Sequence, residues 1–361
     1  MALKLFSGTY RDRRVLVTGH TGFKGSWLAL WLDRLGAHIH AASLPPPTTP
    51  SHWDLLRLRV TEHHIDIRNA REVSAAIGEA RPDIVFHLAA QSLVQQSYRD
   101  PLETWSTNVM GTANVLDACR HHGCVRAIVI ATTDKCYENL ETDRRYREDD
   151  RLGGHDAYSA SKAAAELVAS SYRSAFFHDH DAPLVATARA GNVIGGGDWA
   201  DDRLIPDLVR AVGAGTPLDV RAPSSTRPWQ HVLDCLSGYL QLGERLLARS
   251  PAFARAWNFG PDEQREFTVA EVLDRMREFW PRIQWRAAGG SLGHEARRLR
   301  LDNGDARTLL GWKPVYGLST ALEATAAWYR DFVESQRVTS VEQLAAYVEA
   351  ASRAKPAWVS S

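Results

Sequence analysis

The sequence predicts an α/β protein built on a doubly wound parallel sheet, with a smaller α/β lobe toward the C-terminus. Short, wholly apolar runs such as "IVFHLAA" and "AIVIATT" are typical of strands that are buried on both faces. Segments of helical periodicity alternate with these runs through the first half of the chain, which is the order of β-α units. A glycine-rich turn follows the first apolar run, where such a sheet commonly receives a ligand.

The strands and helices are expected in the following order along the chain. The predicted strands cover residues 14–17, 38–43, 65–67, 84–88, 127–131, 184–190 and 256–260. The predicted helices cover residues 22–35, a segment that ends near 77, and residues 107–120 and 157–177. Because the strands are apolar on both faces, we expect helices to cover both sides of the sheet.

The regular alternation of strands and helices weakens after residue 190. We expect residues 1–190 to form a Rossmann-type domain, to which residues 228–262 return. Residues 191–227, which are rich in Gly, Asp, Arg and Pro, are expected to form the substrate-binding lobe together with residues 263–350. Residues 351–361 are expected to be a frayed tail.

The composition excludes several classes of partner. Lys plus Arg and Asp plus Glu number 43 each, so no overall field favours nucleic acid or an anionic membrane. No signal-peptide core or membrane-spanning apolar run is visible, and we therefore expect a cytoplasmic protein. The four cysteines form no Cys-x-x-Cys pair and the histidines do not lie beside them at ligand spacing, so no bound metal is expected.

The stretch "TGHTGFKG" places Gly19, Gly22 and Gly25 between a strand and an amphipathic helix. Glycines at these positions permit a tight turn, close approach of the backbone to a pyrophosphate, and close packing of helix on strand. The N-terminus of the helix then offers N–H groups to the anion. The turn therefore predicts a bound dinucleotide, with Phe23 among its contacts.

Residues around this turn indicate which dinucleotide is bound. The acidic residue that usually binds the adenosine ribose is missing from "HIHAASLPPP", where Ser43 offers a weaker hydrogen bond. No arginine stands there to bind a 2′-phosphate, so NAD is expected rather than NADP. Asp66 and Ile67 either hold the adenine edge or belong to a helix N-cap region. His20 and Lys24 are either near the cofactor phosphates or solvated turn residues.

The segment "DAYSASKAAAELV" carries Tyr158 and Lys162 on one face of a helix, four residues apart. A tyrosine with its ordinary pKa of about 10 is a weak base at neutral pH. A nearby lysine ammonium and a cationic nicotinamide would favour the phenolate. Thr133 in "IATTDK" would end a central strand at the carboxyl edge of the same sheet, so these residues predict a site that transfers protons beside the cofactor.

Together these motifs resemble the extended short-chain dehydrogenase/reductase family. The resemblance rests on "TGHTGFKG", "HLAAQ", "NVMGTANVL", "TTDKCYEN" and "YSASK". Within that family the chain is more closely similar to the CDP-glucose 4,6-dehydratases, through "GHTGFKGSW", "TDKCY" and "RPWQHV". The similarity extends from about residue 14 to about residue 328.

The resemblance implies a transient, NAD-dependent oxidation of a CDP-linked glucose followed by loss of water. Tyr158 would take the proton of the sugar's 4-hydroxyl while carbon 4 gives up a hydride, and Thr133 would hydrogen-bond the reacting oxygen. Lys162 would lower the pKa of the tyrosine and hold the nicotinamide ribose. Water would then leave from carbons 5 and 6, with Asp134 as the acid, before the hydride returns to carbon 6. Lys135 would be either the base at carbon 5 or a cation that stabilises the enolate.

The family pattern also suggests residues that line the rest of the site. Ala89 and Ala90 would end a strand with small side chains, so that the cofactor can lie close to the backbone. Asn108 would either lie near the nicotinamide or be a buried helix residue bonded to backbone. Arg189 would either bind phosphate or be a buried structural arginine. The residues expected to bind the CDP-sugar substrate are Gln91, Asn192, Arg203, Arg227 and His294.

Other functions remain open from the sequence. The chain would also suit a dehydratase or a 4-epimerase that acts on another sugar nucleotide, or a cofactor-sensing regulator without catalysis. Many relatives pair through the helix that bears the catalytic tyrosine, so we expect a homodimer or a dimer of dimers.

Overall fold

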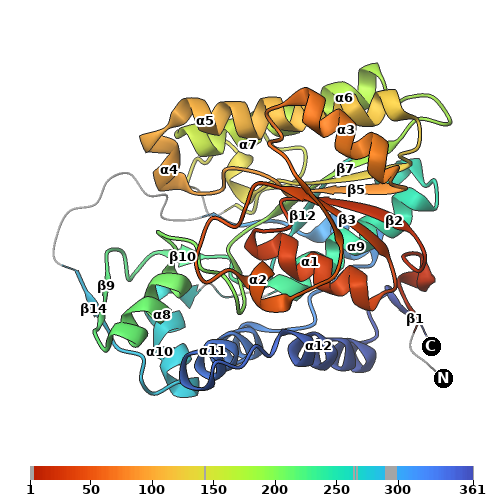
Figure 1. Ribbon diagram of the computed structural model, residues 1–361. Helices are drawn as coiled ribbons and strands as arrows, with labels where there is room; N and C mark the ends of the chain where they lie inside the picture. Colours follow the sequence, from red (N-terminus) through yellow and green to blue (C-terminus); the bar gives the residue numbers. More distant parts are fainter. Residues whose placement is uncertain (1–3, 142–143, 263–264, 266, 289–298, 361) are drawn as a thin grey trace.

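A seven-stranded, all-parallel sheet forms the centre of the computed structural model, which describes residues 4–141, 144–262, 265, 267–288 and 299–360 (Figure 1). The strand order is β12, β7, β6, β5, β2, β3 and β4. Their bounds are β2 (Arg14–Thr18), β3 (His38–Ser43), β4 (Thr61–His64), β5 (Ile84–His87), β6 (Ala127–Ala131), β7 (Leu184–Ala190) and β12 (Ala256–Phe259). The chain reverses its direction across the sheet between β2 and β5, which confirms the predicted doubly wound fold.

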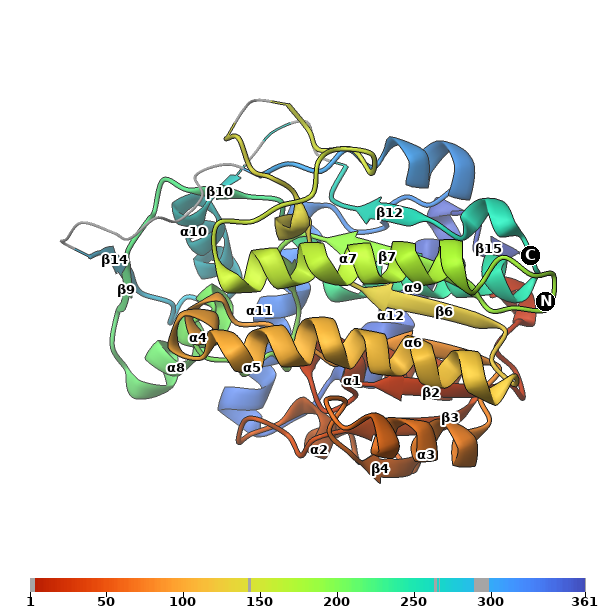
Figure 2. The ribbon, with the colours of Figure 1, turned by 90° about the horizontal axis from the view of Figure 1, so that it is seen from above.

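Helices cover both faces of this sheet (Figures 1 and 2). On one face lie α3 (Ala70–Ala80), α6 (Gly111–His122) and α7 (Ala157–Ala175), and on the other lie α1 (Phe23–Arg34) and α9 (Val232–Leu247). The side chains of β2 alternate accordingly, because Val15 and Val17 join the core on the α1 side whereas Leu16 joins the core beneath α3 and α6. This two-sided burial explains why the strands are apolar throughout.

The helix predicted at residues 107–120 is part of a longer helical run. It begins with α4 (Val94–Arg99) and α5 (Pro101–Trp105), continues through a π-helical turn at Ser106–Met110, and ends with α6. The Asp100 side chain caps α5 by accepting from Glu103 N at 2.9 Å, and Pro101 occupies the first turn. The helical run therefore starts earlier than its apolar periodicity indicates.

The C-terminal part of the chain is built from helices and short strand pairs. The helices are α8 (Leu204–Ala214), α10 (Val269–Phe279), α11 (Leu318–Ser335) and α12 (Ser340–Ala354). The pairs are β8 (Val193–Ile194) with β11 (Gln230–His231), β9 (Leu218–Val220) with β14 (Trp285–Ala287), and β10 (Thr226–Arg227) with β13 (Phe267–Thr268). Short segments complete the described chain: α2 (His52–Leu56), β1 (Lys4–Leu5), β15 (Val359–Ser360), and helical turns at Phe6–Gly8, Asp134–Cys136, Pro251–Phe253 and Ala306–Leu310.

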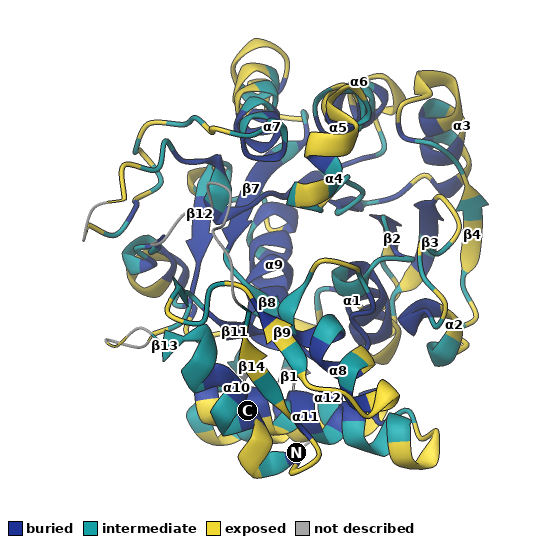
Figure 3. Cartoon of the chain, turned by 90° about the vertical axis from the view of Figure 1, so that its left-hand side faces the viewer, coloured by how far each residue is buried: buried dark blue, intermediate teal, exposed yellow. Residues whose placement is uncertain are grey.

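One hydrophobic core joins the sheet to the C-terminal helices. Figure 3 shows the central strands and α9 as buried, with exposed residues on the outer helices. The same core contains Trp257 of β12, Leu236 of α9, Trp328 of α11 and Tyr347 of α12. The two expected lobes are thus packed on a common core.

Two expectations about local structure are wrong. The third strand is not at residues 65–67 but at Thr61–His64, because this edge strand is polar and half-exposed and so lacks an apolar pattern. The C-terminal segment is not frayed. Trp358 is buried and stacks on Phe6 with 5.0 Å between ring centroids, and β15 pairs with β1. A single buried tryptophan supplies enough apolar area to hold such a segment.

Two further features concern membranes and metals. Within the described ranges, no helix combines the length and the apolar character that crossing a membrane requires. The same residues contain no group of three or more His, Cys, Asp or Glu side chains arranged to hold a metal ion.

Candidate active site

The residues that follow three neighbouring strands lie together at one edge of the sheet. The glycine turn follows β2, Ala89 and Ala90 follow β5, and the segment 132–135 follows β6. Because the strands are parallel and adjacent, these segments meet at the carboxyl edge, where doubly wound sheets bind their ligands. Gly22 is the N-cap of α1 and Phe23 is its first residue.

The glycine turn has room only for backbone. Gly19 has a φ of +75°, and a Cβ on it would lie 2.5 Å from Ala89 N. A Cβ on Gly25 would lie 2.1 Å from Gly19 O, so α1 begins directly against the turn. No side chain caps α1 and its first turn contains no acidic residue, which suits the binding of an anion. The turn therefore fits the pyrophosphate of NAD.

His20 and Lys24 are both held by other side chains. His20 is buried, with Nε2 3.1 Å from Glu62 Oε2 and its ring edge-to-face with Trp53. Burial lowers the pKa of His20 despite the hydrogen bond with Glu62, which favours the neutral ring. Lys24 is half-buried, and its Nζ donates to the Tyr239 hydroxyl at 3.3 Å. The solvated alternative is wrong for His20, and contact with the phosphates stays a prediction for both residues.

The residues expected near the adenosine are bonded within the protein. Ser43 Oγ lies 2.6 Å from Thr21 Oγ1. Asp66 accepts from Arg68 Nε at 2.8 Å, and this hydrogen bond holds the pKa of Asp66 below its usual value. Ile67 is buried, and both it and Asp66 lie in the turn before α3 rather than at a strand end. Their contact with the cofactor stays a prediction.

Tyr158 lies beside Thr133 at the end of β6. It stands in the first turn of α7, which Asp156 caps through its side chain. Burial raises the pKa of Tyr158 and the charge of Asp134 adds to the rise, whereas the charge of Lys135, the Thr133 hydroxyl and the charge of Arg203 act against it. Cations and a hydroxyl partner therefore favour the phenolate in a site that otherwise disfavours it.

Lys162 lies one helical turn beyond Tyr158 on α7. Its Nζ donates to Ala131 O at 3.3 Å, at the end of β6. Burial, followed by repulsion from Lys24, lowers the pKa of Lys162 to about 8, while the charge of Glu166 acts in the opposite direction. The roles of Lys162 in lowering the pKa of Tyr158 and in holding the ribose stay predictions.

Asp134 and Lys135 form a short helical turn, Asp134–Cys136, which Thr133 caps by accepting from Lys135 N at 3.3 Å. Asp134 Oδ1 accepts from Thr133 Oγ1 at 3.0 Å and from Lys135 Nζ at 3.3 Å. The Asp134 side chain is 0% exposed and that of Lys135 is 32% exposed. Asp134 Oδ2 is buried and has no hydrogen-bond partner among the described residues.

Asn108 is a buried hub in the π-helical turn. Its Nδ2 donates to Gln91 O and to Ser161 Oγ, each at 2.9 Å, and its Oδ1 accepts from Gln91 N. Asn108 therefore matches the alternative of a buried helix residue that is hydrogen-bonded within the protein. The Gln91 amide donates to Thr104 Oγ1 at 2.8 Å and accepts from Leu93 N at 2.6 Å. The protein engages both ends of the Gln91 amide, and the contact of Gln91 with the substrate stays a prediction.

A glycine turn suited to a nucleotide, a neighbouring threonine and tyrosine, and a helical lysine thus share one edge of the sheet. The model of the NAD-dependent epimerase/dehydratase family matches residues 15–253. The chain belongs to this family. Its members are enzymes with NAD as cofactor, in agreement with the fit of the glycine turn.

Particular members of the family cover nearly the whole chain. A CDP-glucose 4,6-dehydratase of Salmonella typhimurium is 44% identical over 353 residues, which are 95% of this chain and 98% of that protein. The solved structure of a dTDP-glucose 4,6-dehydratase from Streptomyces venezuelae, with NAD and TYD bound, is 26% identical with a TM-score of 0.73. It covers 88% of this chain and 97% of that one. An epimerase structure from Methanothermobacter thermautotrophicus has a TM-score of 0.79 at 25% identity, and covers 91% and 95% of the two chains.

The residues expected to bind substrate lie in several segments. Arg203 Nη1 donates to Asp198 Oδ2 and its Nη2 donates to Ser92 Oγ, both at 3.0 Å. Asn192 Oδ1 is buried and has no partner among the described residues. His294 lies outside the described residues. Of the two alternatives for Arg189, the structure supports a buried structural role, because Arg189 pairs with Glu166.

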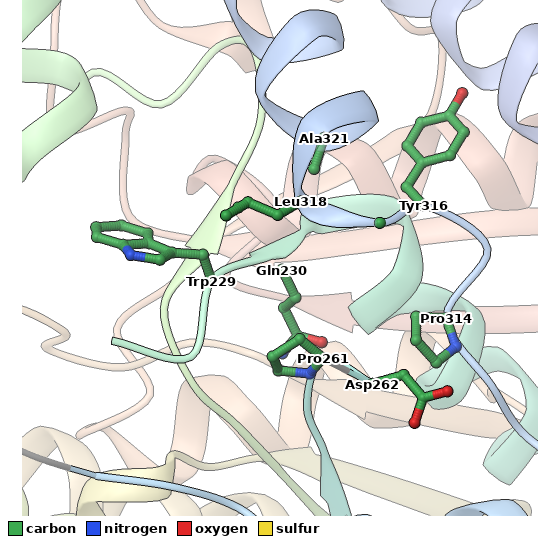
Figure 4. Close-up of a pocket in the computed structure, with 9 residues that line it drawn as sticks. Trp229, Gln230, Pro261, Asp262, Pro314, Tyr316, Leu318 and Ala321 are labelled. Atoms are coloured by element: carbon green, nitrogen blue, oxygen red, sulfur yellow. The ribbon is translucent and has the colours of Figure 1, made fainter. Parts of the chain in front are cut away.

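Arg227 lines a pocket with three further arginines. The pocket is bounded by Arg145, Arg227, Arg265 and Arg300 and by the aromatic rings of Trp229 and Phe267. Guanidinium groups match phosphate oxygens, so a family member that binds a sugar nucleotide has its strongest candidate for a diphosphate site here. A second pocket lies at the start of α11 and contains none of the expected site residues (Figure 4). It is lined by Trp229, Gln230, Pro261, Asp262, Pro314, Tyr316, Gly317, Leu318 and Ala321.

Several residues that support the candidate active site were not predicted from the sequence. Glu62 and Trp53 contact His20, and Tyr239 contacts Lys24. These come from a polar edge strand, a five-residue helix and an apolar helix, where no local pattern marks them. The position of Glu166 could have been predicted, since it stands four residues after Lys162 on the same helix face.

Proposed function

We propose that this chain is a CDP-glucose 4,6-dehydratase that works with NAD and forms CDP-4-keto-6-deoxy-D-glucose. The observation that carries this proposal is the turn at Thr133, Asp134 and Lys135, where a buried carboxylate bonds a hydroxyl and an ammonium beside Tyr158. A 4-epimerase needs a base for the 4-hydroxyl of the sugar. It needs no acid and base pair for elimination, because it releases no water. The 44% identity to the Salmonella enzyme supports CDP-glucose as the substrate.

The first chemical task is oxidation at carbon 4 of the sugar. NAD, when bound on the glycine turn, supplies the hydride acceptor. Tyr158, as a phenolate, takes the proton of the 4-hydroxyl, and Thr133 orients that hydroxyl. Lys135 and Arg203 contribute the positive charge that favours the phenolate.

The second task is elimination of water across carbons 5 and 6. Moving one proton from the Lys135 ammonium to the Asp134 carboxylate produces an amine and a neutral acid without a change in net charge. The amine takes the proton of carbon 5, and the acid protonates the departing 6-hydroxyl, which leaves as water. If Lys135 instead keeps its proton, it stabilises the enolate as a cation, and the base is another group.

Thr133 also lies between Tyr158, which accepts a proton in the reaction, and Asp134, which donates one. After the loss of water, the hydride would return to carbon 6 while Lys135 gives its proton back to carbon 5, which completes the 4-keto-6-deoxy sugar. One turnover therefore leaves Tyr158 with the proton of the 4-hydroxyl and Asp134 without the proton that it gave to the departing water. Thr133 Oγ1 donates to Asp134 Oδ1 and lies beside Tyr158, so its hydroxyl is placed to relay a proton from Tyr158 to Asp134. This route restores both groups without exchange with solvent.

We propose that residues 191–227 and 263–350 supply the sugar-nucleotide lobe, and that residues 1–190 and 228–262 supply the NAD-binding domain. The arginine pocket that contains Arg227 would hold the diphosphate, and Asn192 would donate to it through its amide nitrogen. Arg203 would act on the substrate from the start of α8, near Tyr158.

We also propose that two copies pair through an exposed apolar patch. Leu102, Trp105 and Met110 of the α5–α6 run and Leu167 of α7 are 39–79% exposed. These helical segments lie side by side on the outer face of the molecule (Figure 2). An exposed apolar patch across adjacent helices is typical of a self-complementary interface.

A reducing compartment, the cytoplasm, suits the thiols of this enzyme. Cys119, Cys124, Cys136 and Cys235 are all free. Burial raises the pKa of Cys119, Cys136 and Cys235, which keeps these thiols protonated and unreactive.

The decisive experiment is a substrate panel. The purified protein is incubated with CDP-, dTDP-, GDP- and UDP-glucose, with and without added NAD, and the 4-keto-6-deoxy product is measured by its absorbance in alkali. We expect turnover with CDP-glucose in preference to the other three. Turnover only with another nucleotide would move the assignment to that dehydratase, and epimerised sugar without loss of water would make the protein a 4-epimerase.

A further inference from the structure

The catalytic turn is flanked by two side chains that point to the same buried ion pair. Thr132 precedes Thr133, and Tyr137 follows Cys136. Thr132 and Tyr137 themselves carry out no step of the proposed reaction. Both are nevertheless buried, and each places its hydroxyl on one partner of the pair formed by Glu166 and Arg189.

On the N-terminal side of the turn, Thr132 Oγ1 donates to Glu166 Oε1 at 2.5 Å. Glu166 Oε2 accepts from Thr187 Oγ1 at 2.7 Å and from Arg189 Nη2 at 2.9 Å. Burial favours the neutral acid, but the charge of Arg189 and these hydrogen bonds prevail and leave the pKa of Glu166 lowered. The carboxylate is therefore ionised and bonded through both oxygens.

On the C-terminal side, Arg189 Nη1 donates to the Tyr137 hydroxyl at 2.8 Å, and the guanidinium carbon lies 4.9 Å from the centroid of that ring. The Tyr137 hydroxyl in turn donates to Asn258 Oδ1 at 2.7 Å. The Tyr137 ring stacks on Tyr146 with 5.2 Å between centroids. These contacts hold the residue that immediately follows the catalytic turn in one position.

We propose that Glu166 and Arg189 are positioning residues that hold Thr133, Asp134 and Lys135 in place from both ends, through Thr132 and Tyr137. The inference rests on the proposed dehydratase function, because it assigns a role in that reaction. Glu166 also stands on α7, four residues after Lys162, so the same ion pair connects the catalytic turn to the helix that carries Tyr158.

The burial of the pair supports a positioning role over a purely stabilising one. The side chains of Arg189 and Glu166 are 3% and 1% exposed, so both charges have lost almost all contact with water. The attraction in such a pair repays the lost hydration only in part, and apolar residues of similar size often give equal stability. What an ion pair with fixed hydrogen bonds provides is a defined geometry, and small displacements of reacting groups cost much rate.

The test compares two substitutions at the same carboxylate. Thr132→Val removes the hydrogen bond between the catalytic turn and Glu166, whereas Thr187→Val removes a bond to Glu166 that does not involve the turn. We expect Thr132→Val to lower kcat with CDP-glucose about tenfold or more, with KM and the Kd for NAD within about twofold. Thr187→Val should keep kcat within about twofold, and Thr132→Ser should restore the rate.

A second pair of variants tests the other end of the turn. Tyr137→Phe removes the hydroxyl that Arg189 bonds, and Tyr146→Phe removes a hydroxyl that bonds Leu140 N and Asn139 instead. Amide hydrogen exchange of the peptide over residues 132–137, without substrate, reports the turn directly. Tyr137→Phe and Thr132→Val should accelerate this exchange, and the two control variants should leave it unchanged.

Two failures are distinguishable in these experiments. If the unaltered protein does not turn over CDP-glucose, the proposed function fails, while the exchange measurement still tests the positioning role. If the unaltered protein is active but Thr132→Val and Thr187→Val lower kcat equally, or in proportion to their loss of thermal stability, the positioning role is overturned.

Discussion

Lys135 Nζ lies 3.3 Å from Asp134 Oδ1, so an ammonium that is one-third exposed to solvent pairs with a carboxylate that solvent does not reach. The carboxylate is further bonded by Thr133, and its second oxygen has no partner among the described residues. A substrate that covers Lys135 would remove the pair from water completely. Both groups would then face the sugar without competing water, and this relationship underlies the first prediction.

Replacing Lys135 by Met should stop the exchange of solvent deuterium into carbon 5 of the product, because the amine that takes this proton is lost. The measurement is NMR of the product formed in heavy water, at matched extents of oxidation at carbon 4. Lys135→Arg is the matched control, since it keeps the cation and provides no usable base. Exchange that survives in the Met variant would assign the base to another group, and exchange that survives only in the Arg variant would identify Lys135 as the stabilising cation.

Tyr158→Phe should lower turnover by roughly 10²–10⁴-fold, the usual contribution of a positioned acid or base. Binding of the sugar nucleotide should change little, since the phenyl ring fills the same buried volume. Turnover is measured with the substrate panel and binding by titration calorimetry. A variant that keeps its full rate would show that the phenol does not take the proton of the 4-hydroxyl.

Lys162→Met should stabilise the unliganded protein at pH 7, and the gain should vanish above about pH 10.5. The pKa of Lys162 is about 8 in the folded chain and 10.5 as its ordinary value, so the unfolded chain binds more protons between these values. The native lysine therefore lowers the free energy of unfolding below pH 8. This destabilisation disappears as the pH rises to about 10.5. Each pKa unit corresponds to about 1.4 kcal/mol, which places the gain on the order of 3 kcal/mol.

Urea unfolding at the two pH values measures this difference directly. Lys162→Arg is the control, because its guanidinium stays charged throughout: it should match the unaltered protein at pH 7 and be less stable than the unaltered protein at pH 10.5. Equal stabilisation by Met at pH 7 and pH 10.5 would contradict the lowered pKa.

Gly25→Ala should weaken NAD binding by more than tenfold and lower the free energy of unfolding by about 1–3 kcal/mol. The reason is steric, since the new Cβ would lie 2.1 Å from Gly19 O. Gly213→Ala is the matched control in α8, where a Cβ meets no atom within 4 Å. It should stabilise the protein by about 0.5–1 kcal/mol and leave NAD binding unchanged. Equal NAD affinities in the two variants would refute the assigned role of the turn.

Leu102→Asp should convert a dimer into a monomer in analytical ultracentrifugation, because the side chain is 79% exposed at the centre of the proposed interface. Leu140→Asp is a control of similar exposure, at 67%, in a loop away from that patch. If both variants keep the same mass as the unaltered protein, the dimer forms elsewhere or does not form.

The strands that carry the site could be predicted because their apolar character follows from burial on both faces. The run at 127–131 and the run at 184–190 have the bounds expected from the sequence. The strand at Thr61–His64 escaped prediction because an edge strand buries few side chains, and "TEHH" shows neither an apolar run nor alternation. The end of the chain escaped for a related reason: the burial of Trp358 depends on Phe6, more than 350 positions earlier.

The candidate site was predictable where a motif fixes local geometry. Gly19 and Gly25 had to be small, and Tyr158 and Lys162 had to share a helix face. The hydrogen-bond partners of polar side chains were not predictable, because they depend on tertiary packing. Gln91 shows this, since its amide is used by a loop and a π-helical turn that no sequence pattern indicates.

The contact of Trp358 with Phe6 and Trp31 has a consequence for synthesis in the cell. Phe6 and Trp31 leave the ribosome early, but the ring that covers them is made some 300 residues later. At the usual pace of translation this leaves their apolar surface uncovered for on the order of tens of seconds. A nascent chain of this enzyme therefore exposes aromatic segments to which a chaperone can bind until Trp358 is synthesised.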